Sequence, residues 1–346
     1  MQPHHGHSPR RLPAPPKPPA RGTAGLLLTV FLSAAGLSLY FGGRWLHRQL
    51  VPPPEEEVKI VQSPIKDDEW QEMQEGLLKT SKTYRGNVGI YMKDLHSGRT
   101  WEYNADRLFP SASLIKVPIM ASVMEKVKAG AVTLEMQIKL TRRDRIGGSG
   151  SLKWVREGTS LSVMEIIYKM ITESDNTATR MLIDYFGMDY MSESFKKLGL
   201  VHTNITPQGM SLSSYRVVNE NYTTAREMAG LMERIYDKEL VDKEASDFMM
   251  EVLKRNKSRS RLRKGLPLGW EIGHKTGLLR MACHDVGIVF SPRGDYVLAV
   301  MTSDVPDYTS AKNFISKVAK LTYRYYKIDA DVAQSGAGTA DAVKSI

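Results

Sequence analysis

Residues 109–118 read FPSASLIKVP, and apolar residues continue from there with helical spacing to about Val127. We therefore expect a helix to begin at Ser113, with Lys116 one turn later on the same face. The start of a helix favours negative charge that develops on the Ser113 oxygen. A neutral Lys116 amine within reach would accept the serine proton, provided that burial and nearby cations lower its pKa. This stretch predicts a serine nucleophile activated by a lysine.

The Ser-x-x-Lys pattern is not specific by itself. It also occurs at Ser63-x-x-Lys66 and Ser194-x-x-Lys197, so two of the three matches must be coincidental.

Two further motifs each occur once in the chain. Ser174-Asp175-Asn176 lies between helical runs at 161–172 and 177–186, where these residue types also serve as ordinary helix caps. Lys275-Thr276-Gly277 lies on a strand that begins near Trp270, and an edge strand with a lysine, and with a glycine where the backbone bends, also accounts for it. Separately, each motif has a structural explanation.

Taken together, the three motifs are the signature set of class A β-lactamases and penicillin-binding proteins. The Ser-Asp-Asn motif begins 61 residues after Ser113, and the Lys-Thr-Gly motif begins a further 101 residues on. The stretches 109–118 and 172–178 resemble the same family, and the resemblance extends over roughly residues 67–328.

The resemblance implies a role for each residue of the first two motifs. Ser113 would attack a lactam or peptide carbonyl and form an acyl-enzyme, with Lys116 as the base or its helper. Ser174 would relay a proton to the leaving nitrogen, and Asn176 would hydrogen-bond the side-chain amide of the substrate.

The third motif would bind the substrate. Lys275 and Thr276 would hold its carboxylate, and Gly277 would let the strand approach the ligand closely. Backbone N–H groups of Ser113 and Leu278 would form the oxyanion hole. This chemistry requires no metal and no organic cofactor.

One feature of class A enzymes is not evident. They carry a glutamate on an Ω-shaped loop that activates the deacylating water, and here that loop should lie between Leu200 and Thr224. Its only acid before the next helix is Glu220, which we interpret as a solvated loop residue, and Gln208 cannot accept a proton. We expect hydrolysis of the β-lactam ring of penicillins and cephalosporins. The alternative is a D-Ala-D-Ala peptidase or a slowly deacylating β-lactam receptor.

The first part of the chain has a different composition. Residues 1–23 are basic and Pro-rich, which predicts a disordered tail, and residues 24–43 form an uncharged stretch of 20 residues. That length suits a transmembrane anchor. A cleaved signal peptide with Ser33 and Ala35 at the cleavage site is the other reading. The linker 44–66 would then hold a domain off the membrane.

Charge suggests the orientation. Four cations and no acid lie in the first 43 residues, out of a net charge of +10. The positive-inside bias places the N-terminus in the cytoplasm and the catalytic domain on the periplasmic or extracytoplasmic side of the cytoplasmic membrane. The remaining cations are dispersed among acids, so we expect no nucleic acid partner. We expect a monomer.

The fold class follows from the order of the predicted elements. A helix at 68–83 precedes strands at 87–93 and 100–103. A helical block at about 113–263 precedes strands at 270–276, 284–291 and 295–303, and a helix at 309–326 closes the domain. This order predicts an α+β sandwich in which terminal helices flank a five-stranded antiparallel sheet with an inserted all-helical domain. Residues 329–346 read as a disordered tail.

Overall fold

The computed structural model describes residues 66–211, 217–304 and 307–327. The expected tail 1–23, the anchor 24–43, the linker 44–66 except for its last residue, and the tail 329–346 lie outside these residues. Within the described ranges, no helix combines the length and apolar character needed to cross a bilayer.

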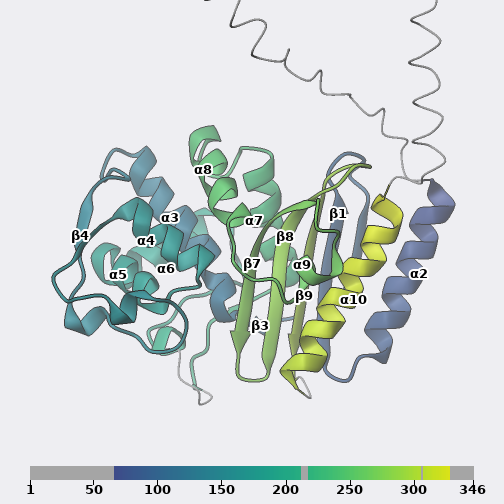
Figure 1. The fold of residues 1–346 in the computed structure, drawn as a ribbon, viewed down its shortest axis with the longest axis horizontal. Coiled ribbons are helices and arrows are strands. Elements are labelled where there is room, and N and C mark those ends of the chain that lie inside the picture. Colours follow the sequence, from purple (N-terminus) through teal and green to yellow (C-terminus); the bar gives the residue numbers. More distant parts are fainter. Residues whose placement is uncertain (1–65, 212–216, 305–306, 328–346) are drawn as a thin grey trace, which may run out of the picture. The chain divides into compact units, whose positions relative to one another are not determined.

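A five-stranded antiparallel sheet has the order β2-β1-β9-β8-β7 (Figure 1). Its strands are β1 (Asn87–Asp94), β2 (Thr100–Tyr103), β7 (Glu271–Leu279), β8 (Ala282–Phe290) and β9 (Tyr296–Ser303). The sheet predicted from the sequence is confirmed, with bounds shifted by no more than three residues. Since β7 lies at the edge of the sheet, one side of its backbone is free to face another element.

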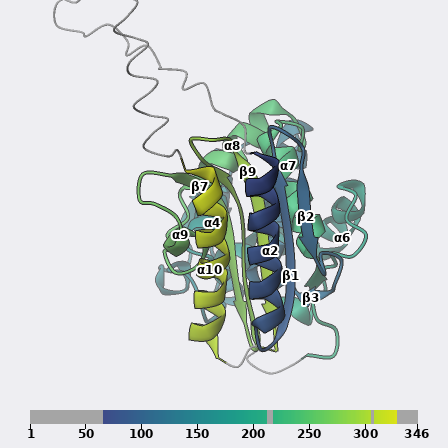
Figure 2. The ribbon, with the colours of Figure 1, turned by 90° about the vertical axis from the view of Figure 1, so that its right-hand side faces the viewer.

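Helices α2 (Asp67–Thr83) and α10 (Tyr308–Tyr326) lie side by side on one face of the sheet (Figure 2). Their buried residues, among them Met73, Leu77 and Ile315, pack in one core with Ile90 of β1 and Leu298 of β9. The two terminal helices are therefore the flanking layer that the element order predicts.

The opposite face of the sheet packs on the helical region. Met301 of β9 and Val286 of β8 belong to a second core, together with Met228 and Met232 of the helix that follows residue 224. Along β9, successive side chains enter opposite cores, because residues alternate between the two faces of a strand. All eight residues of β9 are buried, which explains its continuous apolar sequence.

The region between β2 and β7 is mainly helical. Its α-helices are α3 (Lys116–Lys128), α4 (Val163–Thr172), α5 (Asn176–Phe186), α6 (Met188–Lys197), α7 (Ala225–Tyr236), α8 (Lys243–Lys254) and α9 (Leu262–Gly265). Its 3-10 helices are η1 (Ala112–Ile115), η2 (Arg142–Asp144), η3 (Leu152–Trp154) and η4 (Gly209–Ser211).

The prediction that this insertion is all-helical was wrong in detail. β4 (Gln137–Lys139) pairs with β5 (Ser160–Ser162), and β3 (Phe109–Pro110) pairs with β6 (Tyr222–Thr223). These strands of two or three residues bury one residue each, so they leave no alternating pattern in the sequence.

The start of the nucleophile helix also differs from the prediction. The α-helix begins at Lys116, and Ser113 lies in the 3-10 turn η1 before it. Ala112 has a φ of 47°, in the left-handed region that alanine rarely adopts. Strain of this kind next to a nucleophile persists only where surrounding packing holds it.

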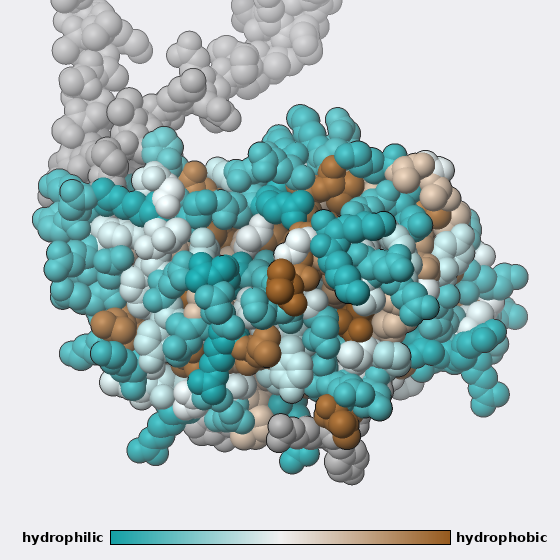
Figure 3. Space-filling model, turned by 180° about the vertical axis from the view of Figure 1, so that it is seen from behind, coloured by the Kyte–Doolittle hydropathy of each residue, from teal (hydrophilic) through white to brown (hydrophobic). Residues whose placement is uncertain are grey.

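The surface of the described domain is mixed. On the face shown in Figure 3, apolar residues are scattered among polar ones. Exposed apolar side chains such as Trp154, Val201 and Leu268 occur on loops and short turns. Singly exposed apolar residues are ordinary on a folded domain.

Candidate active site

Lys116 connects the first two sequence motifs. Its fully buried Nζ donates to the backbone oxygen of Ser174 at 2.7 Å and to Oδ1 of Asn176 at 2.9 Å, and it lies 3.4 Å from Oγ of Ser174. Lys116 begins α3, whereas Ser174 and Asn176 stand at the α4–α5 junction. Two segments 58 residues apart therefore meet at one amine.

Lys275 joins the third motif to the same place. Its buried Nζ donates to Oγ of Ser174 at 3.0 Å and to the backbone oxygen of Thr276 at 2.8 Å. The hydroxyl of Ser174 thus lies between two lysine amines. Ser174 has a φ of 55°, so its backbone is held in an uncommon conformation at this point.

Burial disfavours the charged form of both lysines. It lowers the pKa of Lys116 to about 7, although the nearby carboxylate of Asp175 opposes this shift. It also lowers the pKa of Lys275 well below the usual value, and the neighbouring cations Lys116 and Arg261 add to the effect. Near neutral pH, a large fraction of Lys116 is therefore the free amine, which can accept a proton.

Asp175 has the structural role that its residue type suggested. It is the N-cap of α5, and its buried carboxylate accepts hydrogen bonds from Ala178 N at 2.9 Å and Leu152 N at 2.8 Å. The Ser-Asp-Asn motif is therefore a helix cap at its middle residue and a lysine-binding element at the other two.

Asn176 is held at both ends of its amide. Oδ1 accepts from Lys116, and Nδ2 donates to the backbone oxygen of Gly147 at 2.9 Å. This arrangement ties the 147–151 loop to the lysine. One N–H of the amide remains for another acceptor, since a side-chain amide carries two.

Gly277 allows β7 to pass very close to the nucleophile turn. A Cβ on this residue would lie 3.2 Å from Cβ of Ala112, 3.2 Å from His284 and 3.3 Å from Leu114. The sequence predicted a close approach to a ligand; in the structure the close neighbour is η1 itself. Thr276 is nearly buried, and the side chain of Leu278 is exposed.

His284 supports the segment that leads to Ser113. Burial lowers its pKa to about 4, so the ring is neutral at pH 7, and its Nε2 donates to the backbone oxygen of Pro110 at 2.7 Å. Its Nδ1 accepts from Thr302 N at 3.2 Å. Sequence reasoning missed this residue because its partner is a distant backbone oxygen.

Arg261 is a second residue that the sequence did not single out. Its side chain is buried, Nε donates to Sγ of Cys283 at 3.2 Å, and its charge lowers the pKa of Lys275. It lies in the run KRNKSRSRLRK at residues 254–264, where exposed cations such as Arg259 have the same appearance. Only its burial distinguishes Arg261 from these exposed cations.

The side chains of the two loop residues considered for deacylation have hydrogen-bond partners outside this cluster. The half-buried carboxylate of Glu220 accepts from Asn221 N at 2.8 Å, and burial raises its pKa. Oε1 of the exposed Gln208 accepts from Asn219 N at 3.1 Å. Among the described residues, neither side chain forms a hydrogen bond with Lys116, Ser174 or Lys275.

The coincidental Ser-x-x-Lys match at Ser194 is also explained. Oγ of Ser194 is buried in α6, where it lies 2.7 Å from Oγ of Ser122 and 2.5 Å from Oε2 of Glu125, which accepts its proton, while Lys197 faces solvent. The match at Ser63 lies outside the described residues.

Comparison with known proteins agrees with this geometry. The model of the β-lactamase enzyme family matches residues 71–326. The chain is 26% identical to β-lactamase VEB-1 of Pseudomonas aeruginosa over 262 residues, which cover 71% of this chain and 87% of the relative. It is 28% identical to a β-lactamase of Streptomyces fradiae over 261 residues, which cover 71% of this chain and 84% of the relative.

Solved structures of β-lactamases and of PBP-A have a similar fold. The fold is similar to a β-lactamase from Sphaerobacter thermophilus, with a TM-score of 0.68, 29% identity and coverage of 74% of this chain and 97% of that one. It is also similar to PBP-A, with a TM-score of 0.67, 28% identity and coverage of 76% and 98%. Because the family model spans most of the chain and the three motifs meet at the hydroxyl of Ser174, the chain belongs to the β-lactamase enzyme family, within the superfamily of β-lactamase-like serine hydrolases.

Proposed function

We propose that the protein hydrolyses β-lactams through an acyl-enzyme on Ser113. The observation that carries the proposal is the buried amine of Lys116, whose pKa is about 7 and which lies one turn after that serine. As a free amine, Lys116 accepts the Ser113 proton when Oγ attacks the lactam carbonyl. The carbonyl carbon gains a bond to Oγ, and the oxygen becomes an oxyanion.

Collapse of this tetrahedral intermediate requires a proton for the leaving nitrogen. The hydroxyl of Ser174 lies within reach of both lysines, so it donates its proton to the nitrogen and regains one from Lys116. The C–N bond of the lactam breaks as the nitrogen is protonated. The product of this stage is an ester of Ser113.

Binding of the substrate falls to the third motif. Lys275 and Thr276 hold the carboxylate of the substrate, and the buried charge of Arg261 adds positive potential behind them. The remaining N–H of Asn176 binds the side-chain amide. Backbone N–H groups of Ser113 and Leu278 stabilise the oxyanion, a contribution of about 3 to 4 kcal/mol per donor in comparable sites.

Relatives support the choice of substrate. VEB-1 and several other relatives are named β-lactamases. A mutant of PBP-A has been solved as an acyl-enzyme complex with penicillin G. A site of this fold is therefore able to form the ester that the proposal requires.

A second function has a specific observation in its favour. Glu220 is the only acid between Leu200 and Thr224, and its described hydrogen bond is with Asn221 N. If no other group activates the deacylating water, the ester on Ser113 persists. The protein would then act as a D-Ala-D-Ala peptidase or as a slowly deacylating β-lactam receptor.

Two measurements on the full chain test these functions. We expect turnover of a chromogenic cephalosporin, and we expect Ser113→Ala to abolish it. Mass spectrometry after mixing with penicillin should show an adduct that disappears within seconds. A lasting adduct would favour the second function, and absence of any adduct would contradict both.

We also propose that residues 24–43 anchor the chain in the cytoplasmic membrane as a single pass, with the catalytic domain outside as a monomer. Support comes from the uncharged stretch of 20 residues and from the cations that precede it. The protein should remain in the membrane fraction after alkaline washing, and protease added outside the cytoplasmic membrane should degrade the domain. Release of a shortened chain into solution would favour signal cleavage instead.

A further inference from the structure

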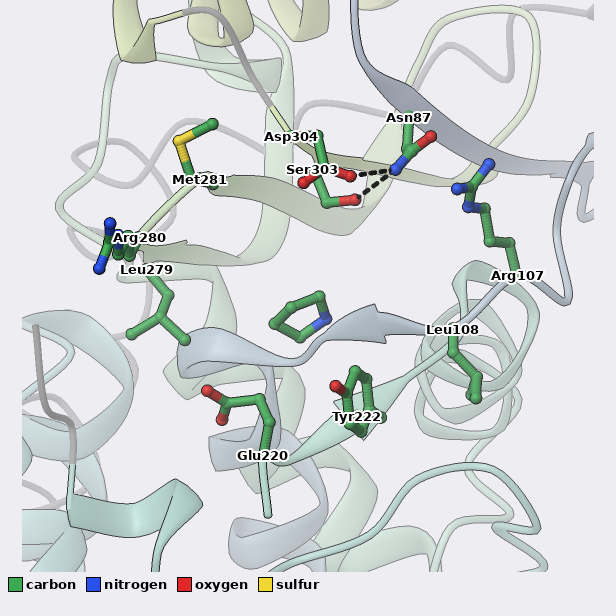
Figure 4. A pocket seen from close by; sticks show the side chains of 11 residues that line it. Asn87, Arg107, Leu108, Glu220, Tyr222, Leu279, Arg280, Met281, Ser303 and Asp304 are labelled. Atoms are coloured by element: carbon green, nitrogen blue, oxygen red, sulfur yellow. Dashed lines mark hydrogen bonds between the residues drawn. The ribbon is translucent and has the colours of Figure 1, made fainter. Parts of the chain in front are cut away.

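A pocket of about 400 Å³ opens beside the proposed catalytic elements, and no role above accounts for it (Figure 4). The β2–β3 loop, the β7–β8 turn, β6 and the ends of β1 and β9 line it. None of Ser113, Lys116, Ser174, Asn176 or Lys275 is among its lining residues. Its size lies within the range of small-molecule sites.

The pocket adjoins the nucleophile along two chain segments. Pro110 lines it and precedes Ser113 by three residues, so their Cα atoms are at most about 11 Å apart. Leu279 lines it and directly follows Leu278, the proposed oxyanion-hole residue. A substituent of a substrate bound at Ser113 is therefore able to reach this pocket.

The pocket carries two arginines, Arg107 and Arg280. Arg107 and Arg280 lie toward opposite edges of the view in Figure 4. Among the residues that the structure describes, neither guanidinium takes part in an ion pair. Either guanidinium is suited to a carboxylate, since it offers several N–H donors.

The pocket also holds two acids, Glu220 and Asp304, and within the described part of the chain neither forms an ion pair. The carboxylate of Glu220 accepts from Asn221 N, and the pocket's other acid, Asp304, already accepts from Nδ2 of Asn87. Glu220 extends from the lower part of the view toward Leu279 (Figure 4). A simple anion would be repelled by Glu220 and Asp304, since the amide of Asn87 does not neutralise the latter, and a simple amine would be repelled by the two arginines.

We propose that this pocket binds the zwitterionic head of an amino acid. The carboxylate of the head pairs with Arg107 or Arg280, and its ammonium group donates to Glu220. Leu108 and Leu279 contribute apolar surface for the carbon chain that follows. The head has two possible sources: a free amino acid, or the side chain of an acylating substrate, and the second source rests on the proposed function of Ser113.

The first arm of the test measures binding of a free amino acid. Full-length Ser113→Ala protein is titrated in a calorimeter with norleucine, hexanoate and hexylamine, which share a chain but differ in their charged groups. We expect norleucine to bind at least about tenfold more tightly than the other two. Glu220→Gln and Arg280→Gln should remove this preference, and Arg324→Gln, an exposed change on α10, should not.

The second arm measures acylation of Ser113. A cephalosporin with a D-α-aminoadipyl side chain is compared with its adipyl analogue, which lacks only the ammonium group. If the head belongs to the substrate, the first compound should acylate the protein about tenfold faster, and Glu220→Gln should abolish the difference.

The outcomes separate the two proposals. A preference in the first arm alone identifies a free amino acid as the ligand, and a preference in the second arm identifies the substrate side chain. Norleucine binding without any acylation would remove the function of Ser113 and leave the pocket. Normal acylation without a preference in either arm would overturn the pocket proposal and leave the function.

Discussion

At the scale of single residues, the site depends on burying positive charge. Lys116 and Lys275 are fully buried and share the hydroxyl of Ser174, and Arg261 is buried behind Lys275. Removing ammonium groups from water disfavours their charged forms, which makes one of them a base at neutral pH. The same burial explains why a lysine, ordinarily protonated, can act at this position.

The pH dependence of acylation should report the titration of Lys116. Its pKa is lowered to about 7, so the reactive free amine predominates above that pH and the inert ammonium below it. We expect the rate of acylation by penicillin to rise between pH 6 and pH 8 and then to level off. Stopped-flow measurements of acylation across this pH range test the prediction. An acylation rate that does not change with pH would contradict Lys116 as the base.

Arg261 should act mainly on binding. We expect Arg261→Gln to raise KM for a chromogenic cephalosporin about tenfold, the equivalent of one hydrogen bond to a charged group, with a smaller change in kcat. Arg259→Gln, an exposed change two residues earlier, is the matched control and should leave KM unaltered. Equal effects of the two changes would mean that Arg261 contributes only general surface charge.

At the scale of elements, the site is built where an edge strand meets a helix start. β7 presents Lys275 and Thr276 on the free edge of the sheet, and Gly277 lets it pack directly on η1. The α4–α5 junction approaches from the helical side, fixed by the Asp175 cap. Long strands were predictable from their apolar runs, but β3 to β6 were too short to leave a pattern.

Gly277→Ala should separate these elements. The added methyl group would lie 3.2 Å from Ala112, whose backbone has little freedom to yield, so β7 must move away from η1. We expect acylation to slow by about a hundredfold, on the scale of losing one oxyanion-hole donor. Gly269→Ala, where a Cβ meets nothing within 4 Å, should change neither acylation nor Tm. Unimpaired acylation in Gly277→Ala would show that the close packing is not needed.

At the scale of the whole domain, one sheet holds two cores together. Leu298 points into the core under α2 and α10, and Met301 points into the core of the helical region. Because neighbouring residues of β9 serve both cores, neither core should survive loss of the strand between them.

Truncating a buried side chain on either face of β9 should therefore destabilise the whole domain. We expect Leu298→Ala and Met301→Ala each to lower the free energy of unfolding by about 2 to 5 kcal/mol. Urea unfolding of the described domain in the full chain should stay a single transition by tryptophan fluorescence and far-ultraviolet circular dichroism. Separate transitions for the two probes would show that the cores unfold independently.

The sequence alone determined the motifs, their order and the main elements, because apolar periodicity and three short signatures are local properties of the chain. It therefore predicted the sheet, the flanking helices and the residues Lys116, Ser174 and Lys275 that the structure brings together. The tertiary structure decided what depends on distant neighbours: the burial that lowers the pKa of Lys116, and the places of Arg261 and His284. Burial and approach are set by segments far apart in the chain, 174 residues in the case of His284 and Pro110, and no local pattern encodes them.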